Sequence, residues 1–280
     1  MHNDLIMQNE EPQMTTTATH NLDLPGPGSV PVTIDDRGEG RPVLLLHGGG
    51  GPQTVAGFAE VLATTGPARV ITPTHPGFGG TPRPDRLASM AGLATLYGEL
   101  LDRLGLHDVT VIGNSIGGWI AAELALLGSA RISGVVLVDA VGIEVDGHPV
   151  TDIFPLSMDE LARLSYYNPA AFRIDPAAMT EDQRAAMAAN RVALAVYGGA
   201  RMADPRLRAR LAAIACPTLV IWGEADRIVD PGYGRAYAAA IPGARFELLP
   251  GTGHLPQLET PEQLMRAAWD FTGAVLPHRE

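Results

Sequence analysis

The chain contains no lysine, and all 20 of its Lys-or-Arg positions are arginines. Schiff-base catalysis, lysine-bound pyridoxal phosphate, a Walker A loop and a Ser–Lys dyad each need a lysine amine, so all four are excluded. Cysteine is almost absent too, and the single Cys216 cannot form a disulfide within the chain. We interpret Cys216, which precedes Pro217 and an apolar run, as a small buried hydrophobic residue.

Long apolar runs are also missing, since no stretch approaches the ~20 residues that a membrane-spanning helix needs. The amino terminus has neither the basic region nor the apolar core of a secretory signal. A formal net charge of −11 argues against nucleic acid or an anionic membrane surface as a partner. We therefore expect a cytoplasmic protein that binds a small-molecule substrate, and a homodimer is one assembly that the sequence allows.

What the sequence does contain is a set of short apolar runs that alternate with helical patterns. With 46% hydrophobic residues, 280 residues are enough for a sizeable core carrying one insertion. The alternation predicts an α/β fold with a mostly parallel, doubly wound sheet covered on both faces. We expect buried strands at 43–46, 70–73, 109–112, 134–140, 218–223 and 245–249. The alternating run 30–35 is typical of an edge strand, and we expect residues 1–28 to form a flexible tail.

Residues 143–213 interrupt this alternation, because they contain no convincing strand. Two capping boxes, at 157–160 and 180–183, indicate helices instead. We predict a helical cap inserted after strand 134–140, above the strand ends where open α/β sheets bind ligands. Helices packed on a sheet face are the alternative. The core domain would then comprise residues 29–142 and 214–280.

The aromatic side chains near this cap are candidates for the walls of a substrate pocket, since such pockets are mostly apolar. Tyr166, Tyr167 and Phe172 lie within the insertion itself. Trp119 lies in the core, four residues after the serine discussed next. We take these four as candidate substrate-binding residues.

A Gly-x-Ser-x-Gly motif lies at 113–117, between a β-branched apolar run and a stretch rich in helix formers. This context is typical of a nucleophile elbow, a tight turn that projects the Ser115 hydroxyl above the sheet edge. The N–H of Ile116, at the start of the helix, would face an oxyanion formed by attack of Ser115. A plain strand-to-helix turn with an incidental serine is the alternative.

A serine nucleophile needs a base, and the base needs an acid that orients it. In elbow architectures these follow the serine in the order acid, then histidine. His254 lies in the loop after the last predicted strand, and we expect it to be the base. Asp226 follows the end of strand 218–223 and is our preferred acid, while Asp139, Asp230 and Glu224 remain open as alternatives.

The second oxyanion donor is expected in the glycine-rich loop at 47–51, where glycine lets the backbone approach closely. We favour the amide of Gly49 and place Gly50 second. The set predicted so far needs neither a metal ion nor an organic cofactor.

Taken together, these motifs resemble the α/β-hydrolase fold family, in the group with a helical cap after the sixth strand. The matching segments are 47–49, 76–79, 113–118, 223–226 and 253–254. The resemblance implies Ser115 as nucleophile, Asp226 as acid, His254 as base, and the amides of Gly49 and Ile116 as oxyanion donors. Aspartate replaces the elbow serine in the haloalkane dehalogenase-like and epoxide hydrolase-like relatives.

Within that group, the Gly-Asn-Ser-x-Gly-Gly motif is partly similar to meta-cleavage product hydrolases, which split carbon–carbon bonds. Those enzymes usually carry tryptophan where this chain has Leu255, and aspartate where it has His75.

The function that we expect is serine-dependent hydrolysis of a small, mostly apolar ester, lactone, thioester or activated carbon–carbon bond. Two alternatives stay open from the sequence. One is a cofactor-free oxygenase or lyase in which His254 is the base, and the other is a non-catalytic ligand receptor on the same fold.

Overall fold

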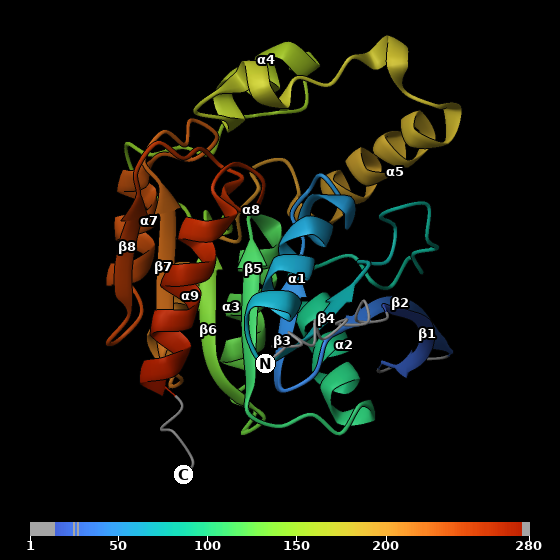
Figure 1. Ribbon diagram of the computed structural model, residues 1–280, viewed down its shortest axis with the longest axis vertical. Helices are drawn as coiled ribbons and strands as arrows, with labels where there is room; N and C mark the ends of the chain where they lie inside the picture. Colours follow the sequence, from blue (N-terminus) through green and yellow to red (C-terminus); the bar gives the residue numbers. More distant parts are fainter. Residues whose placement is uncertain (1–14, 25, 27, 276–280) are drawn as a thin grey trace, which may run out of the picture.

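The computed structural model describes residues 15–24, 26 and 28–275, which are built around one eight-stranded sheet (Figure 1). The strand order is β1-β2-β4-β3-β5-β6-β7-β8. Strand β2 runs antiparallel to both of its neighbours, and every other pairing is parallel. The predicted α/β fold with a mostly parallel sheet is confirmed. The strands are β1 (Thr16–Asp23), β2 (Ser29–Arg37), β3 (Arg41–Leu46), β4 (Ala68–Pro73), β5 (Val109–Asn114), β6 (Ile132–Val138), β7 (Thr218–Gly223) and β8 (Arg245–Leu249).

Helices cover both faces of the sheet, which is why the central strands are apolar on both sides. Along β3, Val43 and Leu45 pack into one core with the helices of the first face, whereas Leu44 and Leu46 pack into the opposite core. No helix in the described part of the chain is long and apolar enough to cross a membrane. The first face carries α1 (Gln53–Thr65) and α9 (Pro261–Val275), and the second carries α2 (Met90–Arg103), α3 (Ile116–Leu126) and α7 (Pro231–Ala239) (Figure 1).

Two predictions about the amino-terminal part are wrong. Residues 16–23 form strand β1 rather than a tail, and β1 pairs with β2, so the run 30–35 is not at the sheet edge. The Thr17 hydroxyl donates to Asp35 at 2.6 Å across this pair. Because Leu22 is the one buried side chain of this polar strand, it carries little apolar signal. Residues 1–14, 25 and 27 of the predicted tail lie outside the described residues.

Residues 143–213, here called the helical segment, connect β6 to β7 and contain none of the eight strands. Both predicted capping boxes form, at the starts of α4 and α5. Figure 1 shows α4 and α5 beyond the carboxyl ends of the central strands. The segment contains α4 (Met158–Ser165), η1 (Pro169–Phe172), η2 (Pro176–Ala178), α5 (Glu181–Gly198), α6 (Leu207–Arg210) and η3 (Leu211–Ala213).

Candidate active site

Ser115 lies between β5 and α3 in a backbone conformation with φ 57° and ψ −116°. A residue with a side chain rarely adopts this region, so the surrounding structure must hold it there. The Ser115 N–H donates to the Val138 carbonyl at 2.9 Å, and the Ser115 carbonyl accepts from the Trp119 N–H at 3.1 Å. The serine is therefore fixed in a strained strand-to-helix turn, as an elbow requires.

Close backbone contacts leave no room for a side chain at either glycine of the motif. A Cβ on Gly113 would lie 2.2 Å from the Gly117 carbonyl oxygen, and one on Gly117 would lie 2.3 Å from that of Leu46. Neither neighbour is a flexible side chain end, so any larger residue would displace the backbone. The motif thus sets the curvature of the turn that carries Ser115.

His254, in the loop after β8, is hydrogen-bonded to Asp226, in the loop after β7. His254 Nδ1 lies 2.7 Å from Asp226 Oδ2, and both residues are buried. Asp226 Oδ1 also accepts the N–H groups of Ile228 at 2.8 Å and Val229 at 3.1 Å. Three donors therefore converge on one carboxylate, and Nε2 of the imidazole remains available for chemistry.

The other acid candidates have different partners. Asp230 caps α7 by accepting the Gly232 N–H at 2.7 Å and pairs with His148 at 2.8 Å. Glu224 accepts the N–H of Gly251 at 3.3 Å. Within the described residues neither is hydrogen-bonded to His254, so of the open alternatives the structure brings Asp226 to the imidazole.

Asp139, the fourth candidate, lies just beyond β6 and is completely buried. Its Oδ1 accepts the Gly223 N–H at 2.8 Å. Burial, followed by the negative charge of Asp226, raises the pKa of the Asp139 carboxyl well above its usual value. Candidate ligand atoms of Asp139, Asp226 and His254 lie within 4.8 Å of one another. Because several of these atoms already bond to one another or to the backbone, we interpret the group as a hydrogen-bonded cluster.

Both the backbone N–H and the carbonyl of His254 are hydrogen-bonded to other parts of the chain. The His254 N–H donates to the Ser165 carbonyl at the end of α4 at 2.7 Å. Asn114 Nδ2 donates to the His254 carbonyl at 3.0 Å, and Asn114 Oδ1 accepts from Gln257 Nε2 at 3.2 Å. Sequence reasoning missed both anchors. Asn114 directly precedes the serine, which is the only local signal that could have pointed to it.

The glycine-rich loop after β3 passes beside the elbow. A Cβ on Gly48 would lie 3.3 Å from Cβ of Ser115, and one on Gly49 would lie 2.9 Å from Leu194 of α5. Ile116 is the first residue of α3, so its N–H has no carbonyl acceptor within the helix. The loop and the helix start therefore lie close to the nucleophile candidate, which is where oxyanion donors are needed.

A buried chain of hydrogen bonds supports this loop, and its geometry determines the tautomers. The backbone N–H of His75 donates to His47 Nε2 at 3.1 Å. His47 therefore carries its proton on Nδ1, which donates to the Gly48 carbonyl at 2.8 Å. The His47 carbonyl accepts from His75 Nε2 at 2.9 Å, so Nδ1 of His75 accepts from the Tyr97 hydroxyl. The two imidazole rings stack with their centroids 3.7 Å apart.

Burial keeps both imidazoles neutral. It lowers the pKa of His47 to about 4 and holds the pKa of His75 well below its ordinary 6.5, with His47 adding to the effect on His75. A neutral imidazole is required in each case, because His47 Nε2 and His75 Nδ1 act as acceptors.

Asn190 of α5 holds the same loop from the other side. Its Nδ2 donates to the Gly50 carbonyl at 2.9 Å, and its Oδ1 accepts the Gly79 N–H at 2.8 Å. Asn190 is only 3% exposed, so these bonds are shielded from water. The helical segment is thereby tied directly to the candidate oxyanion loop. Nothing in the local sequence marked Asn190, because a single asparagine on a helix is usually solvated.

The four predicted substrate-binding residues lie in different environments. Trp119 is almost buried, and its ring packs against the backbone of Gly142. Tyr166 stacks on Phe172 with centroids 4.7 Å apart, and burial raises the pKa of its hydroxyl to about 12. Tyr167 is 63% exposed. The backbone of Tyr166 lies beside the loop that carries the candidate base, since a Cβ on Gly253 would be 2.8 Å from the Cα of Tyr166.

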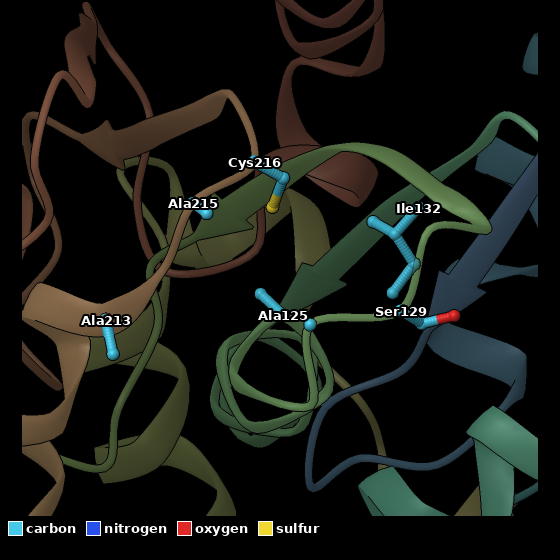
Figure 2. A pocket seen from close by; sticks show the side chains of 7 residues that line it. Ala125, Ser129, Ile132, Ala213, Ala215 and Cys216 are labelled. Carbon is cyan, nitrogen blue, oxygen red and sulfur yellow. The ribbon is translucent and has the colours of Figure 1, made fainter.

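A small cavity of about 200 Å³ lies at the opposite end of the sheet, and Figure 2 shows the side chains that line it. Ala125, Ser129 and Ile132 line it from the end of α3 and the start of β6, and Cys216 lines it from just before β7. Cys216 is half-buried rather than buried as expected, and this partial burial raises the pKa of its thiol, which disfavours the reactive thiolate. This cavity is separate from the carboxyl strand ends where Ser115, Asp226 and His254 gather.

Comparisons with known proteins agree with this architecture. Residues 43–267 match the family described as "Alpha/beta hydrolase family". The chain is 30% identical over 268 residues to a 2-hydroxy-6-oxononadienedioate/2-hydroxy-6-oxononatrienedioate hydrolase of Cupriavidus pinatubonensis, with 86% of this chain and 90% of that protein covered. It is 32% identical over 270 residues to the hydrolase of the same name from Paraburkholderia xenovorans, with 88% and 92% covered.

Among solved structures, the fold is similar to that of a thermophilic esterase from Thermogutta terrifontis. The TM-score is 0.72 at 26% sequence identity, and the match covers 93% of this chain and 99% of the esterase. Both the sequence relatives and this structural neighbour therefore extend over nearly the whole chain.

Proposed function

The chain belongs to the alpha/beta hydrolase family, and from that premise we propose that it is a serine hydrolase using Ser115, His254 and Asp226. The observation that carries the proposal is the 2.7 Å contact between His254 Nδ1 and Asp226 Oδ2. It fixes the neutral imidazole with its proton on Nδ1, so that Nε2 is the basic nitrogen. The strained elbow supplies the nucleophile at the same edge of the sheet.

In the proposed reaction, His254 Nε2 takes the proton of the Ser115 hydroxyl as Oγ attacks the substrate carbonyl carbon. The amides of Gly49 and Ile116 stabilise the negative charge that develops on the carbonyl oxygen. The imidazolium, stabilised by Asp226, then gives its proton to the leaving group. A water activated by His254 cleaves the resulting acyl-enzyme and restores the serine.

We propose that the helical segment forms a cap over this site and selects the substrate. Two arginines of this segment, Arg173 and Arg191, could bind a substrate carboxylate through a bidentate contact, but both are engaged elsewhere. Arg173 pairs with Asp159 at 3.3 Å and is exposed, while Arg191 donates to the Phe154 carbonyl and lies 5.8 Å from the Phe154 ring centroid. The preferred substrates are therefore neutral, mostly apolar esters, lactones or thioesters.

Hydrolysis of an activated carbon–carbon bond is the second candidate, and the names of the relatives favour it. Those proteins are described as hydrolases of 2-hydroxy-6-oxo-nonadienedioates, which are dicarboxylates. An enzyme acting on such substrates needs a cation at the site, and a planar guanidinium is well suited to the task.

The test is a comparison of kcat/KM for a neutral short-chain chromogenic ester and a 2-hydroxy-6-oxo-dienoate, with Arg173→Ala and Arg191→Ala beside the parent. We expect the ester to be preferred and neither substitution to change this preference. Preference for the acid, lost in one arginine variant, would instead establish carbon–carbon hydrolysis. Oxygen consumption with the substrate would point to the oxygenase alternative.

A further inference from the structure

We propose that Asp139 is a positioning residue that remains a neutral carboxylic acid at neutral pH and donates a hydrogen bond from its protonated oxygen to the Asp226 carboxylate. The role in catalysis rests on the proposed function of Asp226, but the protonation state of Asp139 does not. The catalytic cluster would then contain two carboxyl groups and a single negative charge.

The two oxygens of Asp139 have different surroundings. Oδ1 accepts the Gly223 N–H at 2.8 Å. Oδ2 is buried and has no hydrogen-bond partner among the described groups when the side chain is treated as a carboxylate. Leaving a charged oxygen buried without a donor is strongly unfavourable, whereas a protonated oxygen needs only an acceptor.

Asp226 is the acceptor within reach. Candidate atoms of Asp139, Asp226 and His254 lie within 4.8 Å of one another. Asp226 already accepts from His254 and from two backbone amides, which suits the ionised form. Asp139 accepts from only one backbone amide. Of the two carboxyl groups, Asp139 is therefore the one that holds a proton.

The electrostatics agree with the geometry. Asp226, from the loop after β7, and His254, from the loop after β8, are the ionisable groups that face Asp139. Burial and the Asp226 charge both raise the pKa of the Asp139 carboxyl well above its usual value. Ionising both of two neighbouring buried carboxyl groups is strongly unfavourable.

The backbone conformation of Asp139 and its hydrogen bond fix the position of the side chain. Its φ of 45° is unusual for a residue with a side chain, and its N–H donates to the Ile221 carbonyl at 3.0 Å. The strained turn projects the carboxyl from the end of β6 toward the loop that carries Asp226. Donation from Asp139 would fix the Asp226 carboxylate and moderate the basicity that Asp226 confers on His254.

The first test is the pH dependence of stability for the parent and for Asp139→Asn, which preserves shape and an N–H donor. A carboxyl whose folded pKa is raised binds more protons in the folded state than in the unfolded state above pH ~4. The parent should therefore lose stability relative to the variant as pH rises from about 4 to 8. The melting temperature of the parent minus that of the variant should therefore decrease across that range. A value that stays constant or increases would refute the proposal.

Infrared spectroscopy of the parent supplies a measurement that does not depend on the variant folding. We expect a protonated-carboxyl C=O absorption that persists at pH 7, and its absence at that pH would overturn the proposal. Neither this measurement nor the melting experiment requires catalytic activity, so a failure of the proposed hydrolase function would leave both results interpretable.

The role in catalysis is tested by the pH profile of kcat/KM on the chromogenic ester. Asp139→Asn should retain activity within about threefold and leave the acid limb in place, because a neutral donor replaces a neutral donor. Asp139→Ala, which removes the donor, should lower kcat and move the acid limb upward as Asp226 becomes more basic. Loss of most activity in Asp139→Asn would show that the negative charge of Asp139 is required and would contradict the proposal.

Discussion

Nδ1 of His254 lies 2.7 Å from Oδ2 of Asp226, and both side chains are shielded from water. A hydrogen bond of this kind determines which imidazole nitrogen carries the proton. It also provides a charge that stabilises the imidazolium formed during proton transfer. The contact joins the loops after β7 and β8, so two chain segments about 28 positions apart act as one unit.

Asp226→Asn should reduce kcat by about 10⁴, because an amide would favour the wrong tautomer of His254. Asp230→Asn is the matched control, since asparagine can still cap α7 through the Gly232 N–H. Steady-state kinetics of the two variants on the same ester make the comparison. Severe loss in Asp230→Asn with little change in Asp226→Asn would show that the acid is assigned wrongly.

The buried histidine pair predicts a loss of stability in mild acid. The unfolded chain binds protons at His47 and His75 near pH 6.5, whereas the folded chain keeps both neutral down to lower pH. The contribution of this neutral pair to stability therefore falls as pH drops from about 6.5 toward 4. Between pH 6.5 and 4, the melting temperature should fall less for His75→Gln than for the parent. The exposed His107→Gln serves as control, and an equal fall in all three proteins would contradict the network.

Asn190→Ala should uncouple the helical segment from the loop at 48–51. Removing one partner of a buried hydrogen bond costs about 1–3 kcal/mol, and Asn190 makes two such bonds. We expect kcat/KM for the ester to fall and limited proteolysis within 143–213 to accelerate. Asn168→Ala, at an exposed position of the same segment, should change neither. Unchanged proteolysis in Asn190→Ala would mean that other contacts hold the segment.

The sheet could be predicted because its strands are buried on both faces and therefore appear as continuous apolar runs. Val43 to Leu46 illustrates this, since neighbouring residues pack into opposite cores. The β1 strand could not be found in this way, because its polar residues lie at an exposed edge and Leu22 alone is buried. Edge strands are defined by their pairing rather than by their burial.

The candidate site was predictable where a backbone shape demands particular residues. Gly113 and Gly117 are needed by the elbow, and the chain order of acid and histidine limited the remaining choices. The sequence could not distinguish the environments of Asp226 and Asp139, because both follow strand ends. The difference depends on how many N–H groups point at each carboxyl, and these come from the folded loops. Asn190 was missed for the same reason, since both of its partners are distant backbone groups.

The most direct test of the central claim is covalent labelling with a fluorophosphonate, followed by peptide mapping and by kinetics of Ser115→Ala. We expect stoichiometric labelling at Ser115, no labelling in Ser115→Ala, and a loss of about 10⁴ to 10⁶ in kcat with a nearly unchanged melting temperature. Ser129→Ala, in the distant cavity of Figure 2, should behave like the parent. A Ser115→Ala variant that retains most of its ester hydrolysis would contradict the account and leave His254 acting directly on water.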